Sequence, residues 1–209
     1  RFTTAVKNAK TDSLIVSDLP INSYENEYSA ITNSKRLVQA GAHAVKLEGG
    51  KEVSKIIKAV KNSGIPVMGH LGLLPQTAEK YSVQAKKSED AKSLIEDSKI
   101  LEESGVFSIV LEMVTSNVTE IITKSVKIPI IGIGSGINCD GQVLVVHDML
   151  GMFEKIKPKF AKRYLNLSDE IRNAVSSYVN DVKEERFPEQ EHTFSMEKTE
   201  LEKLEKEIV

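Results

Sequence analysis

Residues 42–70, AHAVKLEGGKEVSKIIKAVKNSGIPVMGH, contain one complete strand–helix–strand unit. Ala42 to Leu47 is a short apolar run that is typical of a buried strand. Residues 51–63 carry Val53, Ile56, Ile57 and Val60 at positions i, i+3, i+4 and i+7, which form one face of a helix. Gly64 then ends the helix, and Ile65 to Met68 begins the next strand. The unit predicts two parallel strands joined by a helix.

The same unit recurs on both sides of this stretch. Further strands are expected at residues 13–17, 106–111 and 128–133, and further helices at 27–40, at 88–104 and around 118–122. Ser88 is the expected N-cap of its helix. Near-continuous apolar strands that alternate with helices are typical of a parallel sheet covered on both faces. The sequence therefore predicts an α/β fold.

The pattern changes after residue 140. Helices are expected at 157–164 and 168–185, and a charged helix from Ser195 to Val209 has Leu201, Leu204 and Ile208 on one face. That last helix is interpreted either as a solvated peripheral helix or as a subunit contact. We expect a barrel domain over residues 1–194 and a helical tail over residues 195–209.

Composition excludes several classes of protein. The 209 residues include 28 Lys and Arg against 30 Asp and Glu, a net charge of −2 that argues against a nucleic-acid binder. No apolar run approaches the ~20 residues that a membrane-spanning helix needs. The single cysteine, Cys139, excludes an internal disulfide framework, which fits a cytoplasmic protein.

Charged and polar residues close four successive strands. They are Asp18, Lys46 with Glu48, His70 and Glu112. In a parallel α/β barrel the carboxyl ends of the strands meet around one mouth, where catalytic groups are held rigidly. A carboxylate that ends an apolar run, as Glu112 does, is suited to act as a general base. Asp18 and Glu48 supply hard oxygen ligands of the kind that Mg²⁺ takes.

Each of these residues also has a plainer interpretation, which the sequence leaves open. Asp18 could cap a turn, Lys46 and Glu48 could form a surface ion pair, His70 could be a core histidine, and Glu112 could be a turn residue. The glycine-rich run at 132–136 matches neither a Walker A nor a GxGxxG pattern, so it is weak support for a phosphate site.

Several motifs in this order resemble one family. They are Ser17-Asp18-Leu19-Pro20, the run from Ala44 to Gly50, the run from Gly64 to Leu73, Ile109-Val110-Leu111-Glu112, the run from Ile131 to Gly136, and the run from Asp140 to Asp148. Over roughly residues 1–195 the chain resembles the ketopantoate hydroxymethyltransferases.

The resemblance implies a (β/α)8 TIM barrel that assembles as a homodecamer. It implies an Mg²⁺-dependent, aldol-type transfer of a hydroxymethyl group from 5,10-methylenetetrahydrofolate to α-ketoisovalerate, giving ketopantoate for pantothenate and coenzyme A synthesis. Asp18 and Glu48 would be metal ligands, with Asp18 also facing the keto acid. Lys46 and His70 would contact the substrate, and Glu112 would accept the proton.

The chain also departs from the family pattern. The first two barrel strands, including a Val-Gly-Asp-Ser type segment with a further metal ligand, have no counterpart, and the loop at 76–85 is shorter than expected. We therefore expect an incomplete barrel with its first two strands missing. Two alternatives remain: an Mg²⁺-dependent α-keto-acid enzyme of the phosphoenolpyruvate mutase or isocitrate lyase type, or an inactive truncated barrel that acts as an assembly protein.

Overall fold

The computed structural model describes residues 1–208, which form two compact units. The first contains Arg1–Val145 and the short segment Lys159–Ala161, and the second contains the rest of the described chain. Each unit is treated separately below. The domain boundary expected at residue 194 stays a prediction.

The first unit is built on a six-stranded sheet in which the strands follow one another in chain order and every neighbouring pair is parallel. The strands are β1 (Val16–Asp18), β2 (Ala44–Glu48), β3 (Val67–Gly72), β4 (Ser108–Glu112), β5 (Ile130–Ile133) and β6 (Gly141–Gln142). The predicted α/β fold with a parallel sheet is confirmed. The two-residue strand β6 was not predicted, because it is too short to produce an apolar run.

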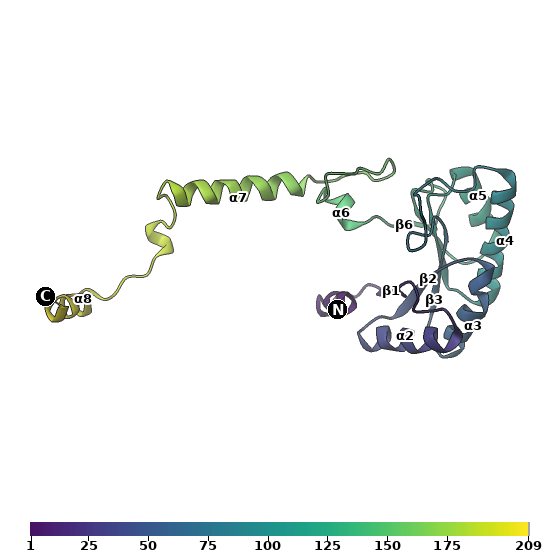
Figure 1. Cartoon of the computed structure of the whole chain (residues 1–209), viewed down its shortest axis with the longest axis horizontal. Coiled ribbons are helices and arrows are strands. Elements are labelled where there is room, and N and C mark those ends of the chain that lie inside the picture. The colour runs from purple at the N-terminus through teal and green to yellow at the C-terminus, as the bar shows by residue number, and fades with distance from the viewer. Residues whose placement is uncertain (209) are drawn as a thin grey trace. The chain divides into compact units, whose positions relative to one another are not determined.

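Four helices line one side of this sheet (Figure 1), each packed on the next along the chain. They are α2 (Glu27–Gln39), α3 (Ser54–Asn62), which follows the 3-10 turn η1 (Lys51–Val53), α4 (Ser88–Ser104) and α5 (Ser116–Ser125). A short helix, α1 (Phe2–Asn8), precedes β1. The N-cap expected at Ser88 is wrong by one position. Lys87 is the N-cap of α4, and it makes no side-chain capping hydrogen bond.

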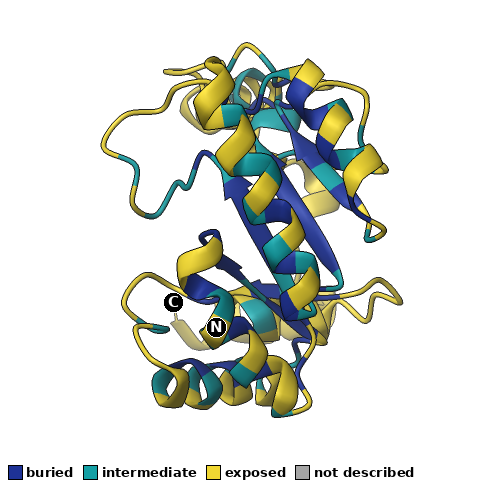
Figure 2. Ribbon diagram, turned by 90° about the vertical axis from the view of Figure 1, so that its right-hand side faces the viewer, coloured by how far each residue is buried: buried dark blue, intermediate teal, exposed yellow. Residues whose placement is uncertain are grey.

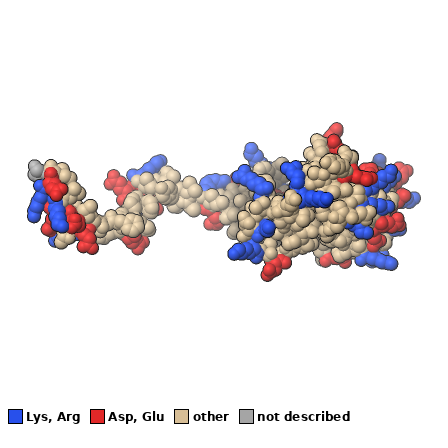
Figure 3. Space-filling model, turned by 90° about the horizontal axis from the view of Figure 1, so that it is seen from below, with Lys and Arg blue, Asp and Glu red and all other residues tan. Residues whose placement is uncertain are grey.

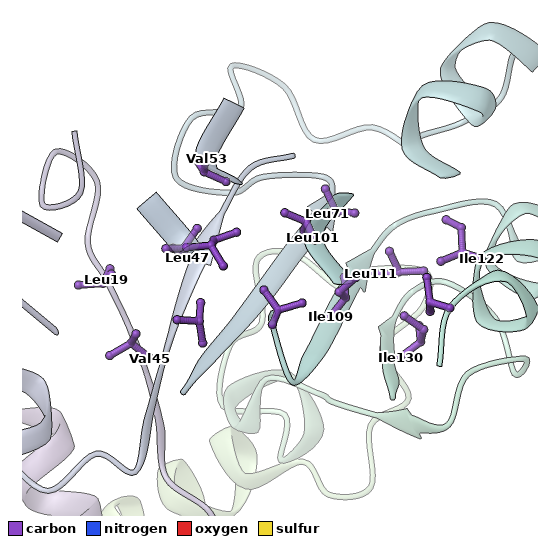
Figure 4. Packing of buried hydrophobic residues seen from close by; sticks show 14 of the residues in the cluster. Leu19, Val45, Leu47, Val53, Leu71, Leu101, Ile109, Leu111, Ile122 and Ile130 are labelled. Carbon is purple, nitrogen blue, oxygen red and sulfur yellow. The ribbon is translucent and has the colours of Figure 1, made fainter. Parts of the chain in front are cut away.

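The core lies between the sheet and these helices (Figure 4). Because side chains alternate along a strand, Val45 and Leu47 of β2 and Ile109 and Leu111 of β4 enter this core. A methyl group at Gly69 would lie 2.9 Å from Leu101 of α4, so a glycine there allows β3 to approach that helix closely. The strands are buried and the helices expose their outer faces (Figure 2). The intervening strand positions therefore face the opposite side of the sheet.

The second unit is mainly helical. It contains α6 (Val146–Met149), α7 (Leu167–Lys183), the 3-10 turn η2 (Gln190–His192) and α8 (Lys198–Ile208). The helix predicted at 168–185 is confirmed and the terminal helix begins at Lys198, while Val209 lies outside the described residues. The helix predicted at 157–164 is wrong, because these residues form turns and loops. Phe160 belongs to the short segment that is part of the first unit, and it packs against the Gly134 turn there.

The surface carries both signs of charge. On the face in Figure 3, Lys and Arg side chains lie among Asp and Glu side chains. None of the helices in residues 1–208 has the length and apolar character needed to cross a bilayer. The six parallel strands correspond to part of a barrel. Closure into eight strands, and the absence of the first two, stay predictions.

Candidate active site

Asp18 and Lys46 lie side by side at the carboxyl ends of β1 and β2. The sheet register pairs the two residues directly, and Lys46 Nζ is 3.1 Å from Asp18 Oδ2. The Lys46 side chain is 15% exposed, whereas that of Asp18 is 55% exposed. The Lys46 side chain is therefore largely buried, which does not fit its interpretation as part of a solvated surface ion pair.

His70 connects Lys46 to the next strands. Lys46 Nζ lies 3.2 Å from His70 Nδ1, and an ammonium can only donate, so Nδ1 accepts. A neutral imidazole with an accepting Nδ1 carries its proton on Nε2, and this tautomer is assigned from the partners. His70 Nε2 is 3.4 Å from Glu112 Oε2 but is not aligned for a hydrogen bond. The His70 side chain is 4% exposed.

Glu112 ends β4 opposite Gly72 of β3, and its side chain is 14% exposed. The backbone around it is held by Ser135, a fully buried residue in the loop after β5. Ser135 Oγ donates to Leu111 O at 2.7 Å and accepts from Val114 N–H at 3.1 Å. Sequence reasoning missed Ser135, although it lies in the glycine-rich run that was considered as a phosphate site.

Glu48 ends β2 and is 6% exposed. Its Oε1 atom is 3.9 Å from His70 Nδ1, and its Oε2 atom accepts from Gln76 N–H at 3.1 Å. The Gln76 side chain also donates, through Nε2, to Leu19 O at 3.1 Å. Sequence reasoning did not assign Gln76 to the site. Its only signal was its place in the short loop that follows the His70 strand.

A cavity of about 250 Å³ adjoins Glu48. Tyr24, Gly49 and Leu74 are among its lining residues. Burial raises the pKa of Tyr24, so the phenol remains a donor at neutral pH, and its hydroxyl lies 3.5 Å from Glu48 O. A larger hollow of about 910 Å³ runs along the edge strand β1 and reaches Asp18. The site therefore adjoins one cavity at Glu48 and another at Asp18.

All five residues that were singled out from the sequence thus belong to one network across four strands. A chain of short contacts runs from Asp18 through Lys46 and His70 to Glu112, with Glu48 beside His70. The model of the family described as ketopantoate hydroxymethyltransferase matches residues 1–190. The chain belongs to the ketopantoate hydroxymethyltransferase family. The resemblance stated from the motifs is confirmed.

The curated relatives that this ketopantoate hydroxymethyltransferase family member matches are also named as hydroxymethyltransferases. The chain is 54% identical to the 3-methyl-2-oxobutanoate hydroxymethyltransferase of Nitrosopumilus maritimus (strain SCM1) over 99% of this chain and 76% of that protein. It is 50% identical to the enzyme of that name from Clostridioides difficile (strain 630) over 97% of this chain and 75% of that protein. These similarities favour the hydroxymethyltransferase interpretation over both alternatives.

A solved structure shares the fold of this hydroxymethyltransferase family member. It is a candidate phosphonomutase from Burkholderia cenocepacia J2315, with a TM-score of 0.50 and 13% identity over 62% of this chain and 57% of that chain. At this identity the likeness concerns the fold alone. It gives no support to the mutase alternative for the function.

The fit of a metal ion to the hydroxymethyltransferase site depends on Asp18 and Glu48. Within residues 1–208, no three His, Cys, Asp or Glu side chains form a group that could hold a metal ion by themselves. Mg²⁺ usually takes only one or two carboxylates and completes its shell with substrate and water oxygens. Asp18 and Glu48 are carboxylates of the required type, and each has only one oxygen in a hydrogen bond or an ion pair shorter than 3.5 Å. The donor set therefore fits Mg²⁺.

Proposed function

We propose that this protein transfers a hydroxymethyl group from 5,10-methylenetetrahydrofolate to α-ketoisovalerate, giving ketopantoate and tetrahydrofolate. The family membership supports the reaction class. The observation that carries the residue assignment is the continuous contact from Asp18 through Lys46 and neutral His70 to Glu112. It groups a cation that can bind a keto acid with a carboxylate that can act as a base.

The first chemical step is removal of the proton on C3 of the keto acid. Glu112 accepts this proton, and the C–H electron pair moves into the enolate. Lys46 stabilises the negative charge that develops on the keto oxygen, because its side chain is largely buried. The His70 ring lies beside this carboxylate, with Nε2 at 3.4 Å from Glu112 Oε2.

The second step joins the two substrates. The enolate carbon forms a bond to the methylene carbon of the folate, and a water oxygen forms the second new bond to that carbon as the hydroxyl group of the product. Both C–N bonds of the methylene carbon break, and the two folate nitrogens take up the proton lost from C3 and the proton lost from water, which releases tetrahydrofolate. Binding both reactants at one rim contributes through proximity and orientation. Asp18 and Glu48 would hold Mg²⁺, which when bound would supply Lewis-acid polarisation of the keto acid.

Product analysis tests this function. The protein is incubated with α-ketoisovalerate, methylenetetrahydrofolate and Mg²⁺, and ketopantoate is quantified by mass spectrometry. Parallel reactions contain isocitrate or phosphonopyruvate in place of the keto acid and folate. Ketopantoate formation supports the proposal. Turnover of isocitrate or phosphonopyruvate without ketopantoate would instead favour the mutase or lyase alternative.

We also propose that the protein is a homo-oligomer, a decamer by resemblance to its family, and that it is cytoplasmic. The helix α7 supports the oligomer, because Ile171, Val175 and Tyr178 are each at least half exposed and lie at i, i+4 and i+7. Light scattering coupled to gel filtration tests the assembly. A decamer gives ten times the chain mass, and a monomeric species at micromolar concentration would contradict it.

A further inference from the structure

Gln76 belongs to the loop between β3 and α4 and reaches two other strand ends. Its backbone N–H donates to Glu48 Oε2 at 3.1 Å, and its side-chain Nε2 donates to Leu19 O at 3.1 Å. Leu19 directly follows Asp18, and Glu48 ends the next strand. One residue of the loop after β3 therefore contacts the loop after β1 and the last residue of β2.

The loop is shaped so that this N–H is available to Glu48. Thr77 N–H and Ala78 N–H both donate to Leu74 O, at 3.1 and 3.0 Å, which makes one helical turn. Gln76 is inside this turn, where N–H groups have no partner within the turn itself. Glu48 accepts that free donor. This is the only hydrogen bond to the Glu48 carboxylate among residues 1–208.

The side-chain amide of Gln76 has one allowed orientation. Leu19 O is an acceptor, so the NH₂ group must face it, and a flipped amide would place two oxygens against each other. Leu19 is fully buried, and its own N–H donates to Lys46 O at 2.8 Å. The backbone N–H of Leu19 is thus held by Lys46 O, and the backbone C=O of Leu19 is held by the Gln76 side chain. The Asp18 carboxylate is attached to the residue just before it.

We propose that Gln76 is a positioning residue that holds the Glu48 and Asp18 carboxylates in register with each other. The proposal rests on the proposed function, in which these two carboxylates would hold Mg²⁺. Gln76 contacts neither reacting carbon. It acts by fixing the separation of the Asp18 and Glu48 carboxylates, which end two different strands. Removal of an outer-shell partner of this kind commonly changes activity by about 10–100-fold.

The test compares Gln76→Leu, which keeps the side-chain size but removes the amide, with Gln84→Leu. Gln84 is in the same loop, but its amide bonds only to Ser82 at the surface. NMR measures exchange of the C3 proton of α-ketoisovalerate in D₂O with Mg²⁺ and without folate. We expect kcat for exchange to fall about 10–100-fold in Q76L, with KM changed less than kcat, and to stay within about twofold of wild type in Q84L.

A double-mutant cycle separates positioning from a general loss of structure. In a Glu48→Gln background, Q76L should lower the exchange rate by much less than in wild type, because residues that act as a unit are not additive. Full additivity, or a Q76L rate within threefold of wild type, would overturn the proposal. If Q76L does not fold, Gln76→Glu, which is isosteric but lacks the N–H donors, replaces it in the same comparison.

An independent readout does not require activity. Amide hydrogen exchange by mass spectrometry should show faster exchange in peptides that cover residues 17–24 and 73–80 in Q76L, but not in Q84L. Unchanged protection in both segments would overturn the proposal. A wild-type protein that fails to exchange the C3 proton would count against the proposed function, and the protection measurement would still decide whether Gln76 holds the loops together.

Discussion

The Nε2 atom of His70 on β3 lies 3.4 Å from Oε2 of Glu112 on β4. On its other side the same ring accepts from Lys46, which fixes the imidazole as the neutral Nε2–H tautomer. His70 therefore separates the cation from the base. Lys46 is free to bind an anionic substrate without neutralising Glu112 directly, and this separation underlies the predictions that follow.

Replacing Lys46 with methionine should weaken keto-acid binding. The change keeps the aliphatic stem and removes a charge that is 15% exposed and lies 3.1 Å from Asp18. Truncating one partner of a buried charge contact with a ligand costs about 2–5 kcal/mol, so we expect the Kd for α-ketoisovalerate to rise about 30-fold or more. Calorimetric titration measures this. Lys58→Met, at an exposed position on α3, is the control, and equal affinities in K46M and K58M would remove Lys46 from the binding site.

Gly72→Ala should unfold the protein more easily and displace Glu112. Gly72 has φ +92°, and a methyl group there would lie 2.3 Å from the backbone oxygen of Glu112. The left-handed conformation alone costs an alanine about 1–2 kcal/mol. The collision adds to it, so we expect the free energy of unfolding to fall by more than about 2 kcal/mol. Chemical denaturation measures the change.

Gly64→Ala is the matched control for that substitution. Gly64 has φ +87°, and a methyl group there would meet no atom within 4 Å. Only the conformational cost of about 1–2 kcal/mol applies, and activity should be retained. If G72A and G64A lost the same stability, contact between Gly72 and the Glu112 backbone would not be what restricts position 72.

Asp97→Asn should stabilise the protein at neutral pH. Asp97 on α4 accepts from Lys51 N–H at 3.1 Å, and burial raises the pKa of its carboxyl. A raised pKa in the folded state means that folding favours the protonated form, so the wild type loses stability as pH rises through that pKa. Asparagine keeps an acceptor oxygen without the charge.

The predicted pH dependence follows from this sign. D97N should exceed wild type in thermal stability at pH 7, and the difference should shrink as the pH falls toward the ordinary Asp value of about 3.9. Thermal melts from pH 4 to pH 8 measure it, with Glu103→Gln on the exposed face of α4 as the control. A stability gap that widens on acidification would show that the Asp97 carboxyl is not destabilised by burial.

The sequence predicted the sheet and its polar rim because both depend on local patterns. Apolar runs mark β2 and β4, and parallel order places the residues that end them, Glu48 and Glu112, at the same edge. The supporting contacts were not predictable in this way. Gln76 reaches Leu19 across 57 residues, and Ser135 reaches Leu111 across 24, so no periodicity links either pair. The failed helix at 157–164 has the same cause, since Phe160 packs on the distant Gly134 turn.

The rate at which the Glu112→Gln variant exchanges the C3 proton of α-ketoisovalerate tests the central claim most directly. The substitution is nearly isosteric and removes the base while leaving Lys46 and Asp18 in place. We predict that exchange measured by NMR falls at least about 100-fold, the usual contribution of a general base, while calorimetry shows a Kd for the keto acid within a few-fold of wild type. An exchange rate equal to that of the wild type would contradict the assignment of Glu112 as the base.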